Sequence, residues 1–121
     1  MFWELLLATQ LSAGGMGFNE AKAFADRHEA ALERPQTAQL LASQANVAGR
    51  SFATCMPSPA PKSLPSFTVV LMLDGTGKPQ RSWLKGDTEF ARCVERQFAA
   101  SVFFQPPSAP FYTSFEFTFE P

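Results

Sequence analysis

The sequence predicts a single α+β domain in which helices cover one face of a small three-stranded antiparallel sheet. Two observations support this prediction. Apolar residues recur at helical spacing in three segments, whereas three shorter segments alternate between apolar and polar residues or are rich in β-branched residues. The chain has 121 residues, of which 45% are hydrophobic, and a chain of that length can bury a core without extra cross-links.

The charge of the chain argues against nucleic acid or a membrane surface as a partner. The formal net charge is −1, and the ten lysines and arginines are scattered singly or in pairs. A nucleic-acid surface or a polybasic membrane patch needs a cluster of basic residues. The sequence therefore predicts neither kind of binding.

Residues 1–18, MFWELLLATQLSAGGMGF, form a segment apart from the domain, which is expected to comprise residues 19–121. The apolar run and the small residues after it are typical of an export signal, but no lysine or arginine precedes the run and Glu4 lies inside it. The segment is either an imperfect or truncated export signal or an apolar helix that packs on the domain or on a partner. The run is too short to span a bilayer, so membrane association is expected only if these residues are retained and bind a membrane.

Two helices are expected before the sheet. The first begins with Asn19 as its N-cap and is interrupted at Arg34-Pro35. Its residues at helical spacing are Phe24, His28, Ala31 and Leu32. The second begins at about Gln36, and its stripe is Leu41, Ala45, Ala48, Phe52 and Cys55. These spacings place each set on one helical face, which is expected to be buried.

A β-hairpin is the clearest local prediction. The proline-rich stretch CMPSPAPKSLPS, residues 55–66, favours an extended connector. SFTVVLML, residues 66–73, is apolar on both faces and predicts a central strand. DGTGK, residues 74–78, predicts a hairpin turn with two glycines at positive φ, and PQRSWLK, residues 79–85, is a more polar returning strand.

A third helix and a last strand complete the pattern. Asp87 can cap a helix whose stripe is Phe90, Cys93, Val94, Gln97, Phe98, Ser101 and Val102. FYTSFEFTF, residues 111–119, alternates between a phenylalanine-rich core face and a wet face that carries Tyr112, Ser114, Glu116 and Thr118. The last strand is expected to lie beside one of the two earlier strands, and the sequence pattern allows both placements. The apolar first strand makes the better centre, which leaves the second and third strands as edges.

The two cysteines fall on the apolar faces of two helices that are expected to cover the same sheet. Cys55 and Cys93 either form a disulfide, expected if the protein is exported, or remain unpaired as small buried side chains, which is common in reducing compartments. The chain-entropy model gives such a disulfide a stabilisation of about 4 kcal/mol. Two cysteines and one histidine cannot supply four zinc ligands, so neither a metal site nor a cofactor is expected.

The run FTVVLMLDGTGKPQRSWLKGDTEFARCVERQFAASVFFQPP, with FYTSFEFTF after it, resembles the TonB C-terminal domain superfamily. In that superfamily an apolar strand, a glycine-containing turn, a second strand, a helix with an aromatic-proline stop and a final amphipathic strand follow one another. The chain is most similar to the variant at the ends of periplasmic gliding-motility proteins, which has one cysteine in the helix before the first strand and one in the later helix. Cys55 and Cys93 stand at those places, and the resemblance covers about residues 50–120.

The resemblance implies an exported, periplasmic, non-catalytic module whose sheet edge accepts a strand from a partner protein. By position, the contacts at that edge would be Tyr112, Ser114, Glu116 and Thr118. Trp83, on the more polar strand, is the aromatic residue expected to anchor an interface; its alternative is packing against the covering helix. Exposed edges also leave open the pairing of two copies of the chain.

Some features of the sequence depart from the TonB pattern. It shows no transmembrane anchor, no long proline-rich spacer and no Tyr-Pro motif ahead of the domain, so energy transduction from an inner-membrane motor is not implied. Residues 19–49 add a helical pair that has no counterpart in the minimal domain. These helices could cover the surface that TonB uses.

The alternatives to a strand-binding module are an inhibitor and an enzyme. A small secreted or periplasmic inhibitor or immunity-type protein would block its target by surface complementarity, with the extra helices in the binding face. An enzyme is not expected, because no pair of carboxylates is forced into one cleft and His28 has no Cys, Ser or Asp at a telling spacing. The DGTGK turn leads from strand to strand, so no helix N-terminus follows it to bind phosphate.

Overall fold

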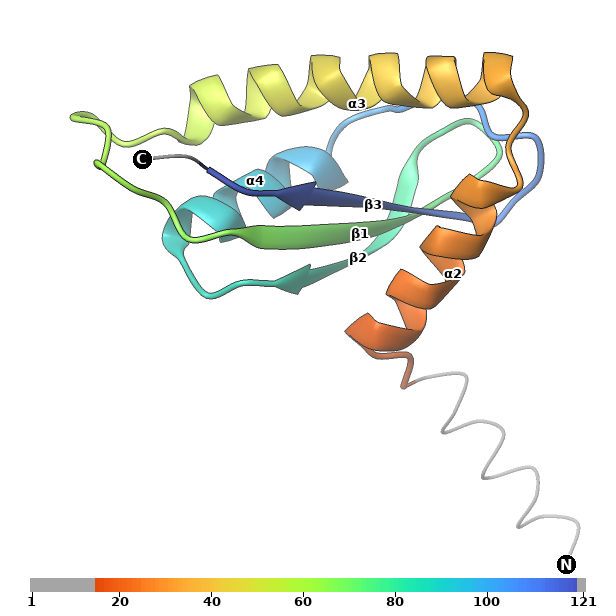
Figure 1. The fold of residues 1–121 in the computed structure, drawn as a ribbon, viewed down its shortest axis with the longest axis horizontal. Helices are drawn as coiled ribbons and strands as arrows, with labels where there is room; N and C mark the ends of the chain where they lie inside the picture. The colour runs from red at the N-terminus through yellow and green to blue at the C-terminus, as the bar shows by residue number, and fades with distance from the viewer. Residues whose placement is uncertain (1–14, 120–121) are drawn as a thin grey trace, which may run out of the picture.

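The computed structural model describes residues 15–119, and it confirms the α+β class. The elements in chain order are α2 (Phe18–Ala30), α3 (Arg34–Cys55), β1 (Phe67–Leu73), β2 (Pro79–Lys85), α4 (Glu89–Ala99) and β3 (Phe111–Phe117). The strand order is β2-β1-β3, and both pairings are antiparallel (Figure 1). The first strand is therefore the centre and the other two are edges, as predicted. Most of the proposed export signal, residues 1–14, lies outside the described residues.

The central strand buries side chains on both of its faces. Val69 and Leu71 belong to the larger core, which α3 and α4 cover, whereas Val70 belongs to a second cluster with Ala21 and Ala25 of α2. All five of these side chains have no exposed surface. The face expected to carry helices is covered by α3 and α4, and α2 covers the opposite face. That second cover is needed because β1 is apolar on both sides.

The helix starts differ from the predicted ones by one or two residues. Gly17, not Asn19, is the N-cap residue of α2. The second helix begins at Arg34, because Glu33 and Gln36 form a reciprocal capping box and a proline suits the first turn. Thr88, not Asp87, caps α4, and its hydroxyl accepts a hydrogen bond from the N–H of Ala91.

The stripe predicted for α3 is only partly buried. The buried residues of this helix are Leu40, Val47 and Ser51, and the side of the stripe that carries Leu41 faces solvent, with Leu41 itself 57% exposed. The buried face of α3 is displaced by one residue from the predicted stripe, so Leu40 lies in the core where Leu41 was expected. Val102, expected on the stripe of the next helix, is 62% exposed because that helix ends at Ala99.

The predicted disulfide between Cys55 and Cys93 is present. It joins the last residue of α3 to the middle of α4. Disulfides are typical of exported proteins. Among residues 15–119, no helix combines the length and the apolar character that a bilayer crossing requires.

The predicted hairpin turn between β1 and β2 is present and is anchored to the segment after α4, but only one of its two glycines, Gly77, has the predicted positive φ. The carboxylate of Asp74 accepts hydrogen bonds from the hydroxyl of Thr76 and from the N–H groups of Lys78 and Thr76, which lower its pKa below the ordinary value. Gly77 has a φ of 88°, and its carbonyl accepts a hydrogen bond from the N–H of Phe103 at 2.9 Å. A glycine is required there because an added Cβ would lie 2.4 Å from the carbonyl oxygen of Phe104.

Reduction of the disulfide is expected to lower the free energy of unfolding by about 4 kcal/mol, the chain-entropy value for a loop of this length. The measurement is urea unfolding of the oxidised and reduced protein. The Cys55→Ser/Cys93→Ser double variant is the control, because its unfolding curve should not respond to reductant. Equal midpoints for oxidised and reduced protein would contradict the expected role of the cross-link.

Gly77→Ala is expected to destabilise the fold by more than about 1 kcal/mol, because its positive φ and the nearby carbonyls both disfavour a Cβ. Gly75 lies in the same turn with open space around it, so Gly75→Ala is the matched control and should change stability by less than about 0.5 kcal/mol. Thermal unfolding of both variants tests this pair. If both variants lose a similar amount of stability, the loss comes from replacing a glycine in this turn and not from the positive φ and close carbonyls at Gly77.

Candidate functional site

The last turn of α2 lies against the outer edge of β3 near the start of that strand (Figure 1). The N–H of Tyr112 donates to Nδ1 of His28 at 3.0 Å. The N–H of Ser114 donates to a carboxylate oxygen of Glu29 at 2.9 Å. Both donors point away from β1, and both acceptors come from the last turn of α2. We call His28 and Glu29 the α2 cover, and residues 112–114 the covered edge.

A polar network holds this cover in place. The hydroxyl of Thr113, whose residue has no exposed surface, donates to the carboxylate of Glu29 and accepts from Nε2 of Gln44 at 2.9 Å. Gln44 lies on α3, so the network joins α2, β3 and α3. A buried hydroxyl with both a donor and an acceptor partner carries no desolvation penalty for an unpaired group.

Aromatic packing closes the other side of the cover. The ring of Tyr112 stacks on Phe24 at 5.1 Å between centroids and meets the imidazole of His28 at 5.6 Å. Burial, and secondarily the charge of Arg27, lowers the pKa of His28 below its ordinary value of 6.5. The lowered pKa favours the neutral imidazole, which can accept the hydrogen bond at Nδ1.

The second half of β3 has no such cover. Because alternate residues of a strand direct their N–H groups to the same side, the N–H of Glu116 points outward like those of Tyr112 and Ser114. Among residues 15–119 no hydrogen-bond acceptor is found for it. The side chain of Glu116 is 65% exposed and lies 3.5 Å from Nζ of Lys22. We call residues 116–118 the open edge.

A groove of about 280 Å³ runs between this part of β3 and α3. We call it the α3 groove; its lining residues are Leu41, Gln44, Ala45, Ala48, Ser114, Phe115, Glu116 and Phe117. The helix side of the groove consists of the apolar residues Leu41, Ala45 and Ala48 together with Gln44, so it is mainly apolar. Leu41, which is largely exposed, stands at one end of it.

The other edge of the sheet, on β2, is protected against an added strand. It begins with Pro79, which has no N–H to donate. The pairing with β1 then shifts so that Gln80 has no partner, which makes a bulge. Arg81 and Lys85 follow as exposed charged residues. Proline, a bulge and charged side chains are the features by which natural sheets block edge pairing.

The residues expected at a partner site are placed in three different settings. The prediction that Tyr112 lies on a wet face is wrong: it is 6% exposed because Phe24 and Trp83 pack on its ring. Tyr112 and Ser114 belong to the covered edge, whereas Glu116 and Thr118 are exposed. Trp83 is half-buried on the opposite edge strand, and its Nε1 donates to the carbonyl of Met16 at 3.0 Å. The structure therefore brings only the two later residues to an accessible edge.

Other residues of this region were not predicted as part of a site. They are the two residues of the α2 cover and the groove residues of α3. The exposed stripe position Leu41 had a signal in the sequence, since it lies at helical spacing with Ala45 and Ala48. Helical spacing alone does not distinguish a face buried in the core from an apolar face that is open to solvent.

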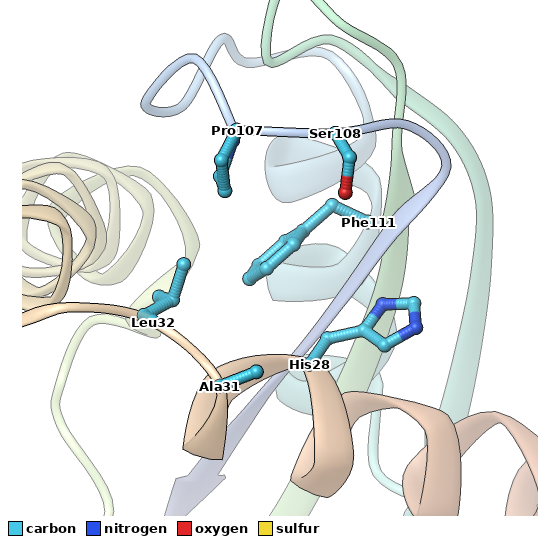
Figure 2. Close-up of a pocket in the computed structure, with 6 residues that line it drawn as sticks. All are labelled: His28, Ala31, Leu32, Pro107, Ser108 and Phe111. Carbon is cyan, nitrogen blue, oxygen red and sulfur yellow. The ribbon is translucent and has the colours of Figure 1, made fainter.

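A second cavity, of about 100 Å³, lies between the end of α2 and the segment that leads into β3. Its lining residues are His28, Ala31, Leu32, Pro107, Ser108 and Phe111 (Figure 2). Figure 2 shows the ring of His28 turned away from Leu32 and Pro107, so the cavity is lined mainly by apolar groups. It is smaller than the roughly 300 to 1,000 Å³ typical of small-molecule sites. Within the described part of the chain, no three His, Cys, Asp or Glu residues are grouped to hold a metal ion.

Comparison with known proteins identifies no relative: no family model, no curated protein and no solved structure matches this chain. The resemblance to the TonB C-terminal domain therefore stays a prediction that depends on the order and spacing of the motifs.

Glu29→Ala is expected to lower the free energy of unfolding by about 1–3 kcal/mol, because it leaves the N–H of Ser114 and the buried hydroxyl of Thr113 without their acceptor. Glu29→Gln keeps an oxygen acceptor and should lose less. Urea unfolding of the two variants provides the comparison. If Glu29→Ala is as stable as the wild type, the network does not hold the cover.

Proposed function

We propose that this protein is a non-catalytic protein-interaction module that binds an extended segment of a partner protein at the open edge of β3. The observation that carries the proposal is the outward N–H of Glu116, which has no acceptor within residues 15–119 and lies beside the α3 groove. Backbone groups of an incoming strand satisfy such a donor, and side-chain pockets beside the edge provide selectivity.

The groove supports a particular pattern in the partner. Successive residues of an added strand point alternately to the two faces of the sheet. On the α3 side they would meet Ala45, Ala48 and Leu41, where small residues leave room for large apolar side chains. On the other side they would meet the charged pair of Glu116 and Lys22. The partner segment is therefore an alternating one, apolar toward α3 and polar on the opposite face.

The proposed location is the bacterial periplasm. The disulfide supports an oxidising compartment, and the TonB-like order of motifs narrows that compartment to the periplasm. The same resemblance supports strand addition as the binding mode. Pairing of two copies through their β3 edges would use the same donors and is an outcome that the experiment below distinguishes.

A small inhibitor or immunity-type protein is the second candidate. One observation favours it: the helices before the sheet cover half of the edge that TonB-like binding would use. In such a protein the target would contact exposed side chains and would not need the backbone donor at position 116.

The test begins with a displayed library of ten-residue peptides selected against the intact, oxidised protein. The expected peptides alternate between large apolar and polar residues, and their footprint in nuclear magnetic resonance (NMR) spectra covers the open edge and the α3 groove. Glu116→Pro removes the outward donor at a position where an edge strand tolerates proline. It should weaken binding at least tenfold, whereas Glu116→Ala, which keeps the N–H, should retain most of the affinity.

A second pair of variants tests the groove. Leu41→Asp places a charge at its end and should weaken peptide binding at least tenfold. Val102→Asp changes an equally exposed apolar residue outside this groove and should leave binding unchanged. Loss of binding in Leu41→Asp with full binding in a folded Glu116→Pro variant would reject strand addition and favour the second candidate. If no peptide binds and the protein forms dimers in a concentration-dependent way, pairing of two copies through their β3 edges is favoured.

A further inference from the structure

We propose that the α2 cover occupies the β3 edge in place of a partner strand and so inhibits strand binding there. Acid releases this cover. His28 and Glu29 supply acceptors to two outward N–H groups that are two residues apart on β3, at 3.0 and 2.9 Å. An added strand presents its carbonyl oxygens to an edge with the same spacing. The cover therefore occupies the donors that a longer partner strand would use, and it limits the accessible edge to its second half.

The hydrogen bond at His28 is possible in only one protonation state. Nδ1 accepts from the N–H of Tyr112, so it carries no proton, and in the neutral ring the proton is on Nε2. Protonation of the imidazole would place a hydrogen on Nδ1, directed at the N–H of Tyr112. Two donors would then face each other, and this contact between α2 and β3 would be lost.

The charged and titratable groups around the imidazole do not offset this loss. On α2 the neighbours are Arg27, which disfavours a second positive charge, and Glu29, whose carboxylate is engaged by Thr113 and Ser114. From β3 the titratable group is the phenol of Tyr112, and the ring of Phe111 packs at 5.6 Å. The segment that leads into β3 contributes Pro107 and Ser108, which are uncharged.

The direction of the pH effect follows from these surroundings. The pKa of His28 is lower in the folded protein than the ordinary 6.5, because burial and then Arg27 disfavour the charged form. The unfolded or uncovered state therefore binds the proton more tightly. The cover is fully stable above pH 6.5 and loses stability as the pH falls from there through the folded pKa. Acid thus shifts the equilibrium toward the uncovered edge.

The release itself requires no partner and is tested on the free protein. NMR titration from pH 7.5 to 5 should show the amide of Tyr112 and the ring of His28 changing with one common midpoint, below pH 6.5. Over the same range the protection factors for amide exchange at Tyr112 and Ser114 should fall at least fivefold, since the last turn of α2 leaves as a unit. The amide of Phe115, which lies on the β1 side of the strand, is the internal control and should not change.

His28→Asn is the matched variant, because the amide oxygen of asparagine can take the place of Nδ1 without titrating. Its covered edge should stay protected at pH 5. The proposal is overturned if His28 titrates while the amide of Tyr112 does not respond, if Ser114 keeps its protection in the wild type at pH 5, or if His28→Asn loses protection as the wild type does. The wild-type measurements decide the matter even if the variant does not fold.

A second measurement tests the link to strand capture, which rests on the proposed function. A peptide from the display selection, lengthened by two or three residues toward Tyr112, should bind the wild type at least threefold more tightly at pH 5 than at pH 7.5. His28→Asn should show no such gain. Acid release of the amides without any gain in affinity would leave the release established and would count against capture at this edge.

Discussion

The structure depends on the burial of one short strand from both sides. β1 has apolar residues on both faces, with Val69, Val70 and Leu71 all fully buried. One helical layer cannot cover both faces, so α2 lies on one side while α3 and α4 lie on the other. The chain must then pass from one face to the other around an edge of the sheet. It does so at the start of β3, and this crossing is the reason that His28 and Glu29 reach the outward N–H groups of that strand.

The cover and the open edge are therefore two results of the same chain path. The α2 cover occupies the first half of the β3 edge, and α3 then runs beside the second half without hydrogen bonds to its outward groups among the described residues. The disulfide fixes the far end of α3 to α4, which keeps this wall of the groove over the sheet. A strand edge with a fixed apolar wall and unpaired donors is the combination that strand-capturing domains use.

Much of the fold could be predicted from local patterns, whereas the site could not. The β-hairpin and the central position of β1 follow from alternation, turn residues and apolar runs. The helical stripes predicted that Cys55 and Cys93 lie over the same sheet but left open whether they pair, and the structure contains the disulfide. The position of α2 on the opposite face depends on contacts with Val70, which no spacing within α2 itself reveals. The stripe that contains Leu41 was predicted to be buried, because an apolar stripe looks the same whether its partner is the core or is another molecule. The roles of His28 and Glu29 arise from hydrogen bonds to residues more than eighty positions away, which lie beyond the reach of any local pattern.

The bulge and proline on β2 bear on how copies of this chain could assemble. Head-to-tail growth needs two free, complementary surfaces on each molecule. Here Pro79 and the bulge at Gln80 block strand pairing at the β2 edge, and the α2 cover shortens the accessible part of the β3 edge. Within residues 15–119 the sheet therefore offers one short accessible edge, and pairing through that edge would give a one-to-one complex or a closed pair and no continuous row of strands. A proline and a bulge at an edge are features that disfavour edge-to-edge pairing of sheets.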